Sequence, residues 1–199
     1  MDMDIGPKSQ PLQIFTTWMN EAKQVPAICE ATSMTLATIN PEGKLHARVV
    51  LCKSWSDTGF TFFTNYSSRK GLDLQHSPEA AGIFFWDPLF RQVKLSGRVS
   101  KVSRQESEEY WRSRPRDSQL SQYASQQSKE VGSREELERV WLATEQKFSG
   151  QNVPCPETWG GYLLVPETIE FWLGRPNRFH DRFEFQKSGN HWTFRRLYP

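Results

Sequence analysis

The chain has 199 residues and a formal net charge of +2, from 25 basic and 23 acidic side chains. This balance excludes a general nucleic-acid or membrane-surface binder, so any basic site must be local. The length fits one domain over residues 1–199, in which we expect residues 1–10 to form a flexible N-terminal segment.

The three cysteines are widely spaced and form no CxxC pair, and the four histidines are scattered. This pattern predicts reduced thiols and no metal site. The first residues form neither a basic nor an apolar leader, and no run of eighteen apolar residues occurs. We therefore expect a soluble, cytoplasmic protein that contacts no membrane.

Apolar periodicity and turn residues predict an α+β domain. An amphipathic helix over 11–23 precedes a hairpin that turns at 40–43, and the segments starting at Ser103 and Ser133 have the capping-box form of helix starts. The antiparallel succession of strands, with helices gathered between them, predicts a closed or half-closed β-barrel. The predicted strands are 33–39, 45–55, 59–64, 80–86, 91–102, 161–173, 178–186 and 191–197, and the remaining helices are 68–75, 104–113, 118–128 and 134–148.

A first candidate anion site lies at 65–71, where a strand ends and a helix begins with Ser67 or Ser68 as its cap. Free N–H groups at a helix start attract anions. Arg69 and Lys70 have the unfavourable sign for this end of a helix, and a bound phosphate would reverse that penalty. The alternative is two solvated basic residues.

A second candidate lies at 110–118, where Arg112, Arg114 and Arg116 surround Pro115. Proline disfavours the α conformation at Arg114, so one helix should end there and another should start with Asp117 or Ser118 as its cap. Arginine supplies the bidentate fork that phosphate oxygens match.

A third candidate is the strand segment 48–53, which carries Arg48 and Lys53 at its ends. In an ideal strand these cations point to opposite faces. Either a bulge intervenes or the two cations serve different ligands.

Near the C-terminus, Arg178, His180 and Arg182 would line one face of a predicted strand at a spacing of roughly 6.6 Å. Such a row suits a planar, polar or anionic ligand, and Trp172 offers a large ring nearby. The alternative interpretation is a solvated strand face. No GxGxxG, P-loop, GxSxG or HExxH motif occurs in the chain.

Taken together, these segments resemble the pyridoxine (pyridoxamine) 5′-phosphate oxidase family. The resemblance runs from about Leu12 to Pro199, and residues 1–10 and the pair Glu30-Ala31 depart from the usual family pattern. The segments that carry it are RVVLCK (48–53), FFTNYSSRKG (62–71), RQV (91–93), YWRSRPRDSQ (110–119), SQQS (125–128), WGGY (159–162) and EFWLGRPNRFHDRF (170–183).

The resemblance implies an FMN-binding split barrel and a homodimer with FMN at the interface. It also implies oxidation of pyridoxine or pyridoxamine 5′-phosphate to pyridoxal 5′-phosphate, with O2 reduced to H2O2. It assigns FMN contacts to Arg48, Val49, Val50, Leu51, Cys52, Lys53, Phe63, Thr64, Arg69, Lys70, Gln92, Gln127, Ser128, Trp172 and Arg182. It assigns substrate contacts to Lys53, Tyr110, Arg114, Ser118, Arg178 and His180, of which Arg178 and His180 are the candidate catalytic residues.

Two alternatives share this fold. A flavin oxidase of the phenazine-biosynthesis type would act on substrates without a phosphate ester, which the run Arg114-Pro115-Arg116-Asp117-Ser118 disfavours. A non-catalytic split-barrel protein that binds flavin or haem would need no pair of Arg178 and His180.

Overall fold

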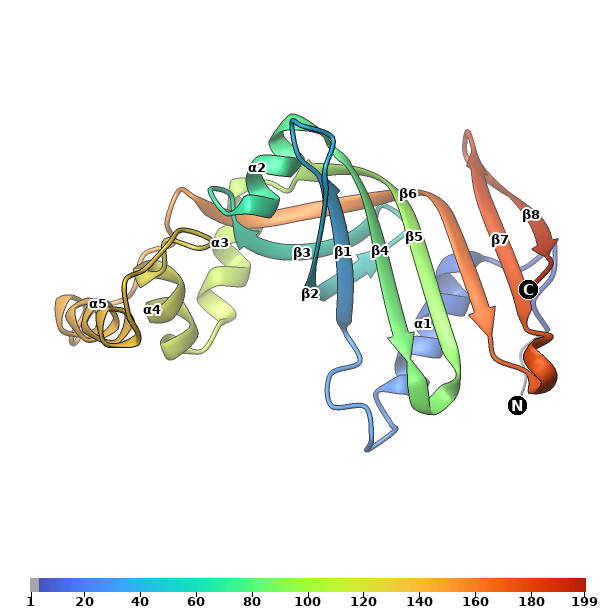
Figure 1. The fold of residues 1–199 in the computed structure, drawn as a ribbon, viewed down its shortest axis with the longest axis horizontal. Helices are drawn as coiled ribbons and strands as arrows, with labels where there is room; N and C mark the ends of the chain where they lie inside the picture. Colours follow the sequence, from blue (N-terminus) through green and yellow to red (C-terminus); the bar gives the residue numbers. More distant parts are fainter. Residues whose placement is uncertain (1–3) are drawn as a thin grey trace.

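The computed structural model describes residues 4–199 and shows a twisted antiparallel barrel with helices at its periphery (Figure 1). The helices are α1 (Pro11–Ala22), α2 (Arg69–His76), α3 (Arg104–Ser113), α4 (Arg116–Ala124) and α5 (Arg134–Lys147). The strands are β1 (Ser33–Ile39), β2 (Leu45–Ser56), β3 (Gly59–Asn65), β4 (Glu79–Trp86), β5 (Arg91–Lys101), β6 (Trp159–Leu173), β7 (Asp181–Ser188) and β8 (His191–Leu197). The predicted α+β split-barrel class is confirmed.

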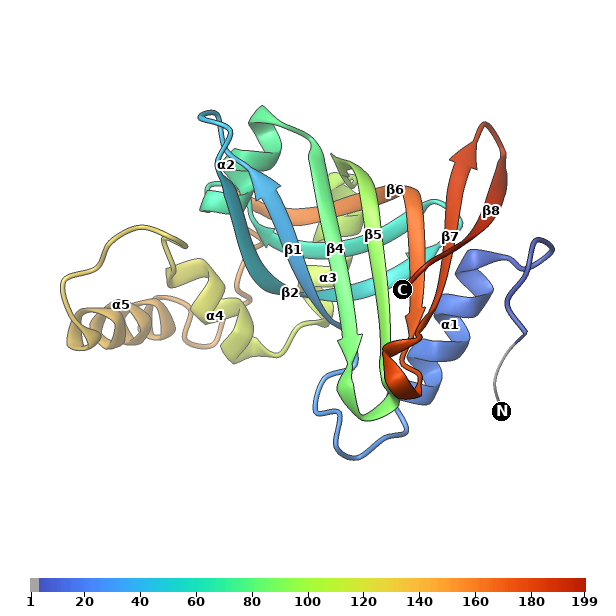
Figure 2. The same cartoon turned by 45° about the vertical axis from the view of Figure 1, so that its right-hand side comes forward.

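One sheet of order β3-β2-β1-β4-β5-β6-β7-β8 forms the barrel. Pairing of β3 with the first half of β6, from Phe60 opposite Leu164 to Asn65 opposite Trp159, closes strands β1 to β6. The second half of β6 leaves the closed part and pairs with β7, which continues into β8 (Figure 2). A strand that belongs to both parts therefore connects the barrel to the C-terminal hairpin.

The main core fills the barrel with alternate strand residues. Met34 and Leu36 of β1 and Phe84 of β4 are completely buried, as period-2 alternation requires. The apolar stripe of α1 packs into this core, where the ring of Phe15 lies 4.8 Å from Phe60 and 5.0 Å from Phe84. Large aromatic side chains thus supply much of the buried area in a chain of modest apolar content.

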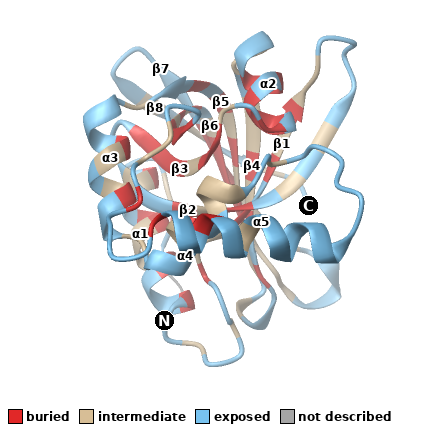
Figure 3. Ribbon diagram, turned by 90° about the vertical axis from the view of Figure 1, so that its left-hand side faces the viewer, coloured by how far each residue is buried: buried red, intermediate tan, exposed pale blue. Residues whose placement is uncertain are grey.

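A second, smaller core joins the helices to the barrel. Trp111, Leu120, Phe148, Val153 and Trp159 form this cluster. By contrast, α5 is almost entirely exposed, with Thr144 its buried residue (Figure 3). The α3–α5 region therefore sits on the barrel through a few aromatic contacts.

Local sequence signals located most helix starts correctly. Ser103 and Ser133 cap α3 and α5 by accepting bonds from Glu106 N and Glu136 N, as the capping boxes predict. The predicted helix 118–128 instead spans Arg116–Ala124, and its cap position is Pro115 without a side-chain cap, so the predicted cap at Asp117 or Ser118 is wrong. The fixed φ of Pro115 suits the residue before a helix, and its ring has no acceptor atom that could form a side-chain cap.

The N-terminal segment predicted to be flexible includes residues 1–3, which lie outside the described residues. Ile5 is buried in the main core, and Gly6 N donates to Ser9 Oγ at 3.0 Å. Across residues 4–199, no helix combines the length and the apolar composition that a bilayer crossing requires.

Candidate functional site

A cavity of about 390 Å³ lies between the barrel and the helices that follow it. We call it the central cavity. It brings together residues predicted for the cofactor and residues predicted for the substrate. Its lining comprises Val49, Val50, Leu51, Lys53, Phe63, Thr64, Lys70, Tyr110, Ser113, Arg114, Pro115, Ser118, Gln122 and Gln127.

Lys70 is a buried cation on the barrel side of this cavity. Its Nζ donates to Thr64 Oγ1 at 3.0 Å and lies 3.5 Å from Gln127 Oε1. Burial, followed by the like charge of Arg48, lowers the pKa of Lys70 to about 8. No carboxylate of residues 4–199 forms an ion pair with it, so a positive charge is held among neutral oxygens.

The start of α2 places this lysine. Ser68 caps the helix by accepting from Gly71 N, as one of the two predicted capping alternatives requires. A Cβ at Gly71 would lie 2.1 Å from the Tyr66 carbonyl oxygen, so only glycine allows the helix to approach this turn. Lys70 consequently points into the barrel wall, whereas Arg69 is exposed and does not line the central cavity.

Arg114 forms the opposite, helical side of the cavity. Its guanidinium carbon lies 5.0 Å from the Trp159 ring and 5.5 Å from the Trp111 ring, and Nη2 donates to the Ser118 carbonyl at 3.2 Å. Burial lowers the pKa of Arg114, although arginine stays charged at neutral pH. Tyr110 stacks on Phe63 at 4.0 Å. Aromatic stacking therefore holds the arginine of the predicted phosphate cluster.

Strand β2 is irregular just before its end. Its pairing with β3 shifts register between Cys52 and Ser54, which agrees with the bulge that was one of the two sequence-based alternatives, and Lys53 lines the central cavity. Cys52 points into the main core, where burial raises its thiol pKa to about 12. Only the backbone of Cys52 is thus available to a ligand.

Arg48 lies beside the cavity and does not line it. Its Nη1 donates to Thr38 Oγ1 at 2.7 Å, and its Nη2 lies 3.5 Å from Asp73 Oδ2, which also faces His46 Nδ1 at 3.0 Å. Burial would raise the pKa of Asp73, but the hydrogen bonds from Thr38 and His46 and the charges of His46 and Arg48 outweigh it, so the pKa is lowered. This ionised acid fixes the Arg48 side chain.

A second polar cluster lies on neighbouring strands at the C-terminal side. Gln92, Trp172 and Arg182 are direct cross-strand neighbours on β5, β6 and β7. Arg182 Nε donates to Glu170 Oε1 at 2.8 Å, and Lys94 Nζ donates to Glu170 Oε2 at 2.5 Å. Three predicted cofactor residues thus form one row on the sheet.

The predicted strand row of Arg178, His180 and Arg182 is wrong. Residues Pro176–Arg178 form a 3₁₀ turn, and β7 begins at Asp181. Asn177 and Arg178 have φ values of 59° and 60°, the left-handed conformation that breaks a strand. Arg178 is consequently exposed on the turn and only Arg182 lies on the strand.

His180 nevertheless stays beside the row. Its ring lies 4.7 Å from the Trp172 ring, and its Nδ1 accepts from Arg175 N at 3.0 Å. With Nδ1 accepting, Nε2 carries the proton of a neutral imidazole. The turn therefore presents His180 Nε2 as a donor next to the indole.

The two clusters do not meet within one chain. Helices α3 and α4, which border the central cavity, lie at the opposite side of the molecule from strand β7, with β2 and β3 between them (Figure 1). Both clusters, however, border the same outer face of the barrel. Cross-strand pairs connect the two along this face, from Val49 through Thr35, Ile83 and Lys94 to Glu170. Val49 and Phe85 on this face are 63% and 57% exposed, an unusual property for apolar strand residues.

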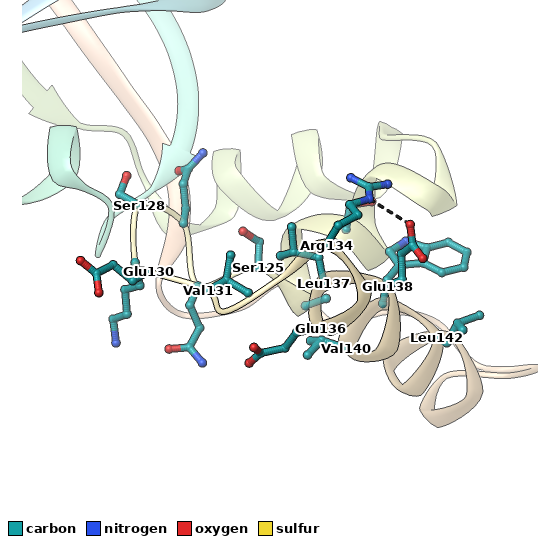
Figure 4. Close-up of a pocket in the computed structure, with 16 residues that line it drawn as sticks. Ser125, Ser128, Glu130, Val131, Arg134, Glu136, Leu137, Glu138, Val140 and Leu142 are labelled. Carbon is teal, nitrogen blue, oxygen red and sulfur yellow. Dashed lines mark hydrogen bonds and ion pairs between the residues drawn. The ribbon is translucent and has the colours of Figure 1, made fainter.

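A groove of about 770 Å³ lies between the 125–131 loop and α5 (Figure 4). Apolar and polar side chains both line it, its basic residues are Lys129 and Arg134, and Arg134 is already paired with Glu138 at 2.9 Å. Gln127 borders both this groove and the central cavity, while Ser128 borders only the groove. The chemistry predicted from the sequence therefore concentrates in the smaller cavity.

Fold and site together define a split-barrel protein with a cavity lined by the cations Lys53, Lys70 and Arg114, and sequence comparison gives its family. The profile described as Pyridoxamine 5′-phosphate oxidase matches residues 21–147, and the one described as Pyridoxine 5′-phosphate oxidase C-terminal dimerisation region matches residues 159–199. The chain belongs to the pyridoxamine 5′-phosphate oxidase family, as its motifs predicted.

Similar proteins support this membership. A pyridoxine/pyridoxamine 5′-phosphate oxidase from Cyanothece sp. is 51% identical over 95% of this chain and 88% of its own length, and one from Pseudomonas putida is 50% identical over 96% and 89%. Among solved structures, PhzG from Burkholderia lata 383 in complex with tetrahydrophenazine-1-carboxylic acid has a TM-score of 0.90 at 29% identity, and each chain is covered completely. A pyridoxamine 5′-phosphate oxidase-related, FMN binding protein from Nostoc punctiforme shares the fold, with a TM-score of 0.78 at 14% identity, covering 98% of this chain and 100% of its own.

The sequence analysis did not identify the acidic residues that form ion pairs with Arg48, Arg182 and Lys94. Asp73 follows Arg69 by four residues on α2, and Glu170 opens the motif that contains Trp172. Both are at most 4% exposed. Buried acids of this kind require charged partners, so an isolated acid within a basic motif was the available signal.

Proposed function

We propose that this protein is an FMN-dependent oxidase that converts pyridoxamine 5′-phosphate or pyridoxine 5′-phosphate to pyridoxal 5′-phosphate. For the amine, the balanced reaction consumes O2 and H2O and releases NH3 and H2O2. One observation carries the proposal: a single cavity holds two separate cationic sites, Lys70 on the barrel side and Arg114 on the helical side. Two phosphate-bearing molecules, a cofactor and a substrate, require such a pair.

The residues around Lys70 fit the phosphate end of FMN. A buried ammonium without an acidic partner is costly, and a bound phosphate would remove that cost. We assign FMN contacts to the residues of β2 and β3 and to Lys70 and Gln127, with Arg69 at the mouth of the site. When bound, FMN supplies the two-electron acceptor for the oxidation and passes the electrons to O2.

The cluster around Arg114 fits the substrate phosphate. Arg114 offers a fork of donors, Lys53 a second cation, and Tyr110 and Ser118 two hydroxyl groups. This phosphate is remote from the reacting carbon, so its binding energy can orient the substrate. The cluster therefore determines where the substrate ring lies.

We further propose a homodimer in which each site uses both chains. The outer barrel face carries exposed apolar residues, and residues 159–199 match a dimerisation region. A second copy on this face would bring its Gln92, Trp172, Arg182, Arg178 and His180 to the central cavity of the first. Arg178 and His180 Nε2 would then donate to the substrate ring, hold its orientation and exclude water from the reacting carbon.

A phenazine-type oxidase is the second candidate, because the PhzG structure bound to tetrahydrophenazine-1-carboxylic acid is so similar overall. Arg114, Lys53 and Ser118 together favour a phosphate ester over a single carboxylate. A turnover assay with pyridoxamine 5′-phosphate, unphosphorylated pyridoxamine and a tetrahydrophenazine carboxylate separates the candidates. We expect turnover of the first compound, and preference for the third would refute the assignment.

A non-catalytic flavin- or haem-binding protein would give no turnover with any of these compounds.

The unpaired state of Cys29, Cys52 and Cys155 favours a reducing compartment, and on this basis we propose a cytoplasmic enzyme.

A further inference from the structure

Gln122 of α4 is a polar side chain in the central cavity to which neither the motifs nor the resemblance gave a role. It follows Ser118 by four residues, and side chains at this spacing lie on the same helix face. Both line the central cavity with Arg114 and Lys53, and both line an adjoining hollow of about 410 Å³ with Arg114. Gln122 therefore belongs spatially to the Arg114 cluster.

The amide nitrogen of Gln122 is unsatisfied. Its Nε2 atom is buried and has no hydrogen-bond partner among the described residues. Gln119 on the same helix differs in this respect, because its Nε2 donates to the Trp111 carbonyl at 2.7 Å. Buried donors are rarely left unpaired in folded proteins, so this amide is suited to a ligand acceptor.

The surrounding groups indicate what that acceptor is. Arg114 and Lys53 make the cavity cationic, and an amide N–H₂ group adds up to two neutral donors. A carboxylate has two oxygens, which one guanidinium fork can occupy. A phosphate monoester has a third terminal oxygen, which lies outside the plane of the two oxygens on the fork, where a planar carboxylate has no acceptor atom.

From these observations we propose that Gln122 is a substrate-binding residue that donates to the third terminal oxygen of the substrate phosphate and thereby selects a phosphate ester over a carboxylate. The inference rests on the proposed function, because it assigns the Arg114 cluster to the substrate. It adds a specificity determinant to that cluster: a planar anion would leave the buried amide unpaired, and a site built around a donor rejects ligands that lack its acceptor.

The test compares Gln122→Met, which keeps the length and removes both polar atoms, with Gln122→Glu, which keeps the shape and adds a negative charge. Gln75→Met, an exposed position on α2, is the matched control. We expect Gln122→Met to raise KM for pyridoxamine 5′-phosphate by about 10- to 100-fold, the equivalent of one hydrogen bond to a charged group, with kcat within about twofold of wild type. Gln122→Glu should raise KM further, and the control should leave it unchanged.

Thermal unfolding separates a binding role from a structural one. In the absence of substrate, Gln122→Met should melt at the wild-type temperature or above it, since no described residue bonds to the amide nitrogen. The rise in Tm on adding pyridoxal 5′-phosphate or inorganic phosphate should be smaller than in wild type. An unchanged KM together with an unchanged phosphate-induced rise in Tm would overturn the inference, as would a lower Tm for the substrate-free variant.

The two proposals fail in different ways. If wild type does not oxidise pyridoxamine 5′-phosphate, the proposed function is refuted. If wild type turns over normally and Gln122→Met matches it in KM, only the role of Gln122 is refuted.

Discussion

The Nζ atom of Lys70 lies 3.0 Å from the hydroxyl oxygen of Thr64, so a buried cation is hydrogen-bonded to a neutral side chain and, among residues 4–199, to no acid. This arrangement is unfavourable for the protein alone and favourable once an anion arrives.

The first prediction concerns Lys70→Met. Removing an uncompensated buried charge should stabilise the flavin-free protein by about 1–3 kcal/mol, a rise in Tm of about 2–10 °C. The same change should weaken FMN binding at least tenfold, because the phosphate loses its buried cation. Calorimetry of the flavin-free protein and fluorescence titration with FMN measure the two effects. A variant that is less stable and binds FMN normally would contradict the assignment.

The second prediction concerns pH. The pKa of Lys70 is lowered to about 8 in the folded protein, so the charged form that binds phosphate is lost as the pH rises through that value. The Kd for FMN should therefore rise roughly tenfold between pH 7 and pH 9. Riboflavin, which lacks the phosphate, and the Lys70→Met variant are the controls, and neither should show this dependence. Equal pH profiles for FMN and riboflavin would disprove it.

The third prediction concerns Arg114→Ala. Loss of a bidentate phosphate contact should raise KM for pyridoxamine 5′-phosphate by at least about 30-fold, or about 2 kcal/mol, while the flavin content stays at the wild-type level. Arg112→Ala, which changes an exposed arginine in the last turn of α3, two residues before Arg114, is the matched control. Steady-state kinetics should separate the two variants, and a KM equal to that of the control would place the substrate phosphate elsewhere.

The fourth prediction tests the shared site. Arg178→Ala should abolish turnover while retaining FMN, and a mixture with Arg114→Ala should recover activity. In a mixed dimer both defects fall in one site and the other site is intact. Random mixing makes half of the dimers mixed, so at a substrate concentration well below the wild-type KM, where Arg114→Ala sites turn over little, the recovered activity should be about a quarter of wild type. Recovery should require exchange of subunits, and its absence after co-expression would argue that each chain builds its own site.

The fifth prediction concerns acid stability. Burial would raise the pKa of Glu170, but its bonds to Arg182 and Lys94 outweigh this, so the folded pKa lies below the unfolded one. The resulting stabilisation is present above about pH 4 and is lost as the pH falls through the folded pKa. Glu170→Gln should lower stability by about 1–3 kcal/mol at pH 7, and the difference from wild type should shrink below pH 4. A constant difference across this range would contradict the ion-pair explanation.

Local signals made much of the fold predictable. The capping boxes at Ser103 and Ser133 depend on contacts within one helical turn, so they can be recognised from the sequence alone. The bulge near Lys53 could be stated only as an alternative, because the pairing of β2 with β3 decides it. Strand alternation failed at Arg178, because Asn177 and Arg178 adopt the left-handed conformation, which periodicity does not detect.

The sequence predicted which residues belong to the candidate site better than it predicted how they are arranged in space. Arg114 and Lys70 stood out because clustered cations near helix starts are chemically unusual. Asp73 and Gln122 did not, because their importance depends on partners distant in sequence or on a missing partner. The separation of Trp172 from the central cavity became visible only once the barrel topology was known.

The most direct test of two phosphate-bearing ligands in one site is the visible absorbance spectrum of the purified, flavin-loaded protein during anaerobic titration. Pyridoxamine 5′-phosphate should bleach the flavin band at one equivalent per site, and admission of O2 should restore it. Unphosphorylated pyridoxamine at the same concentrations should have almost no effect. A spectrum that stays oxidised with the phosphorylated compound, or that bleaches equally with both compounds, would contradict the account.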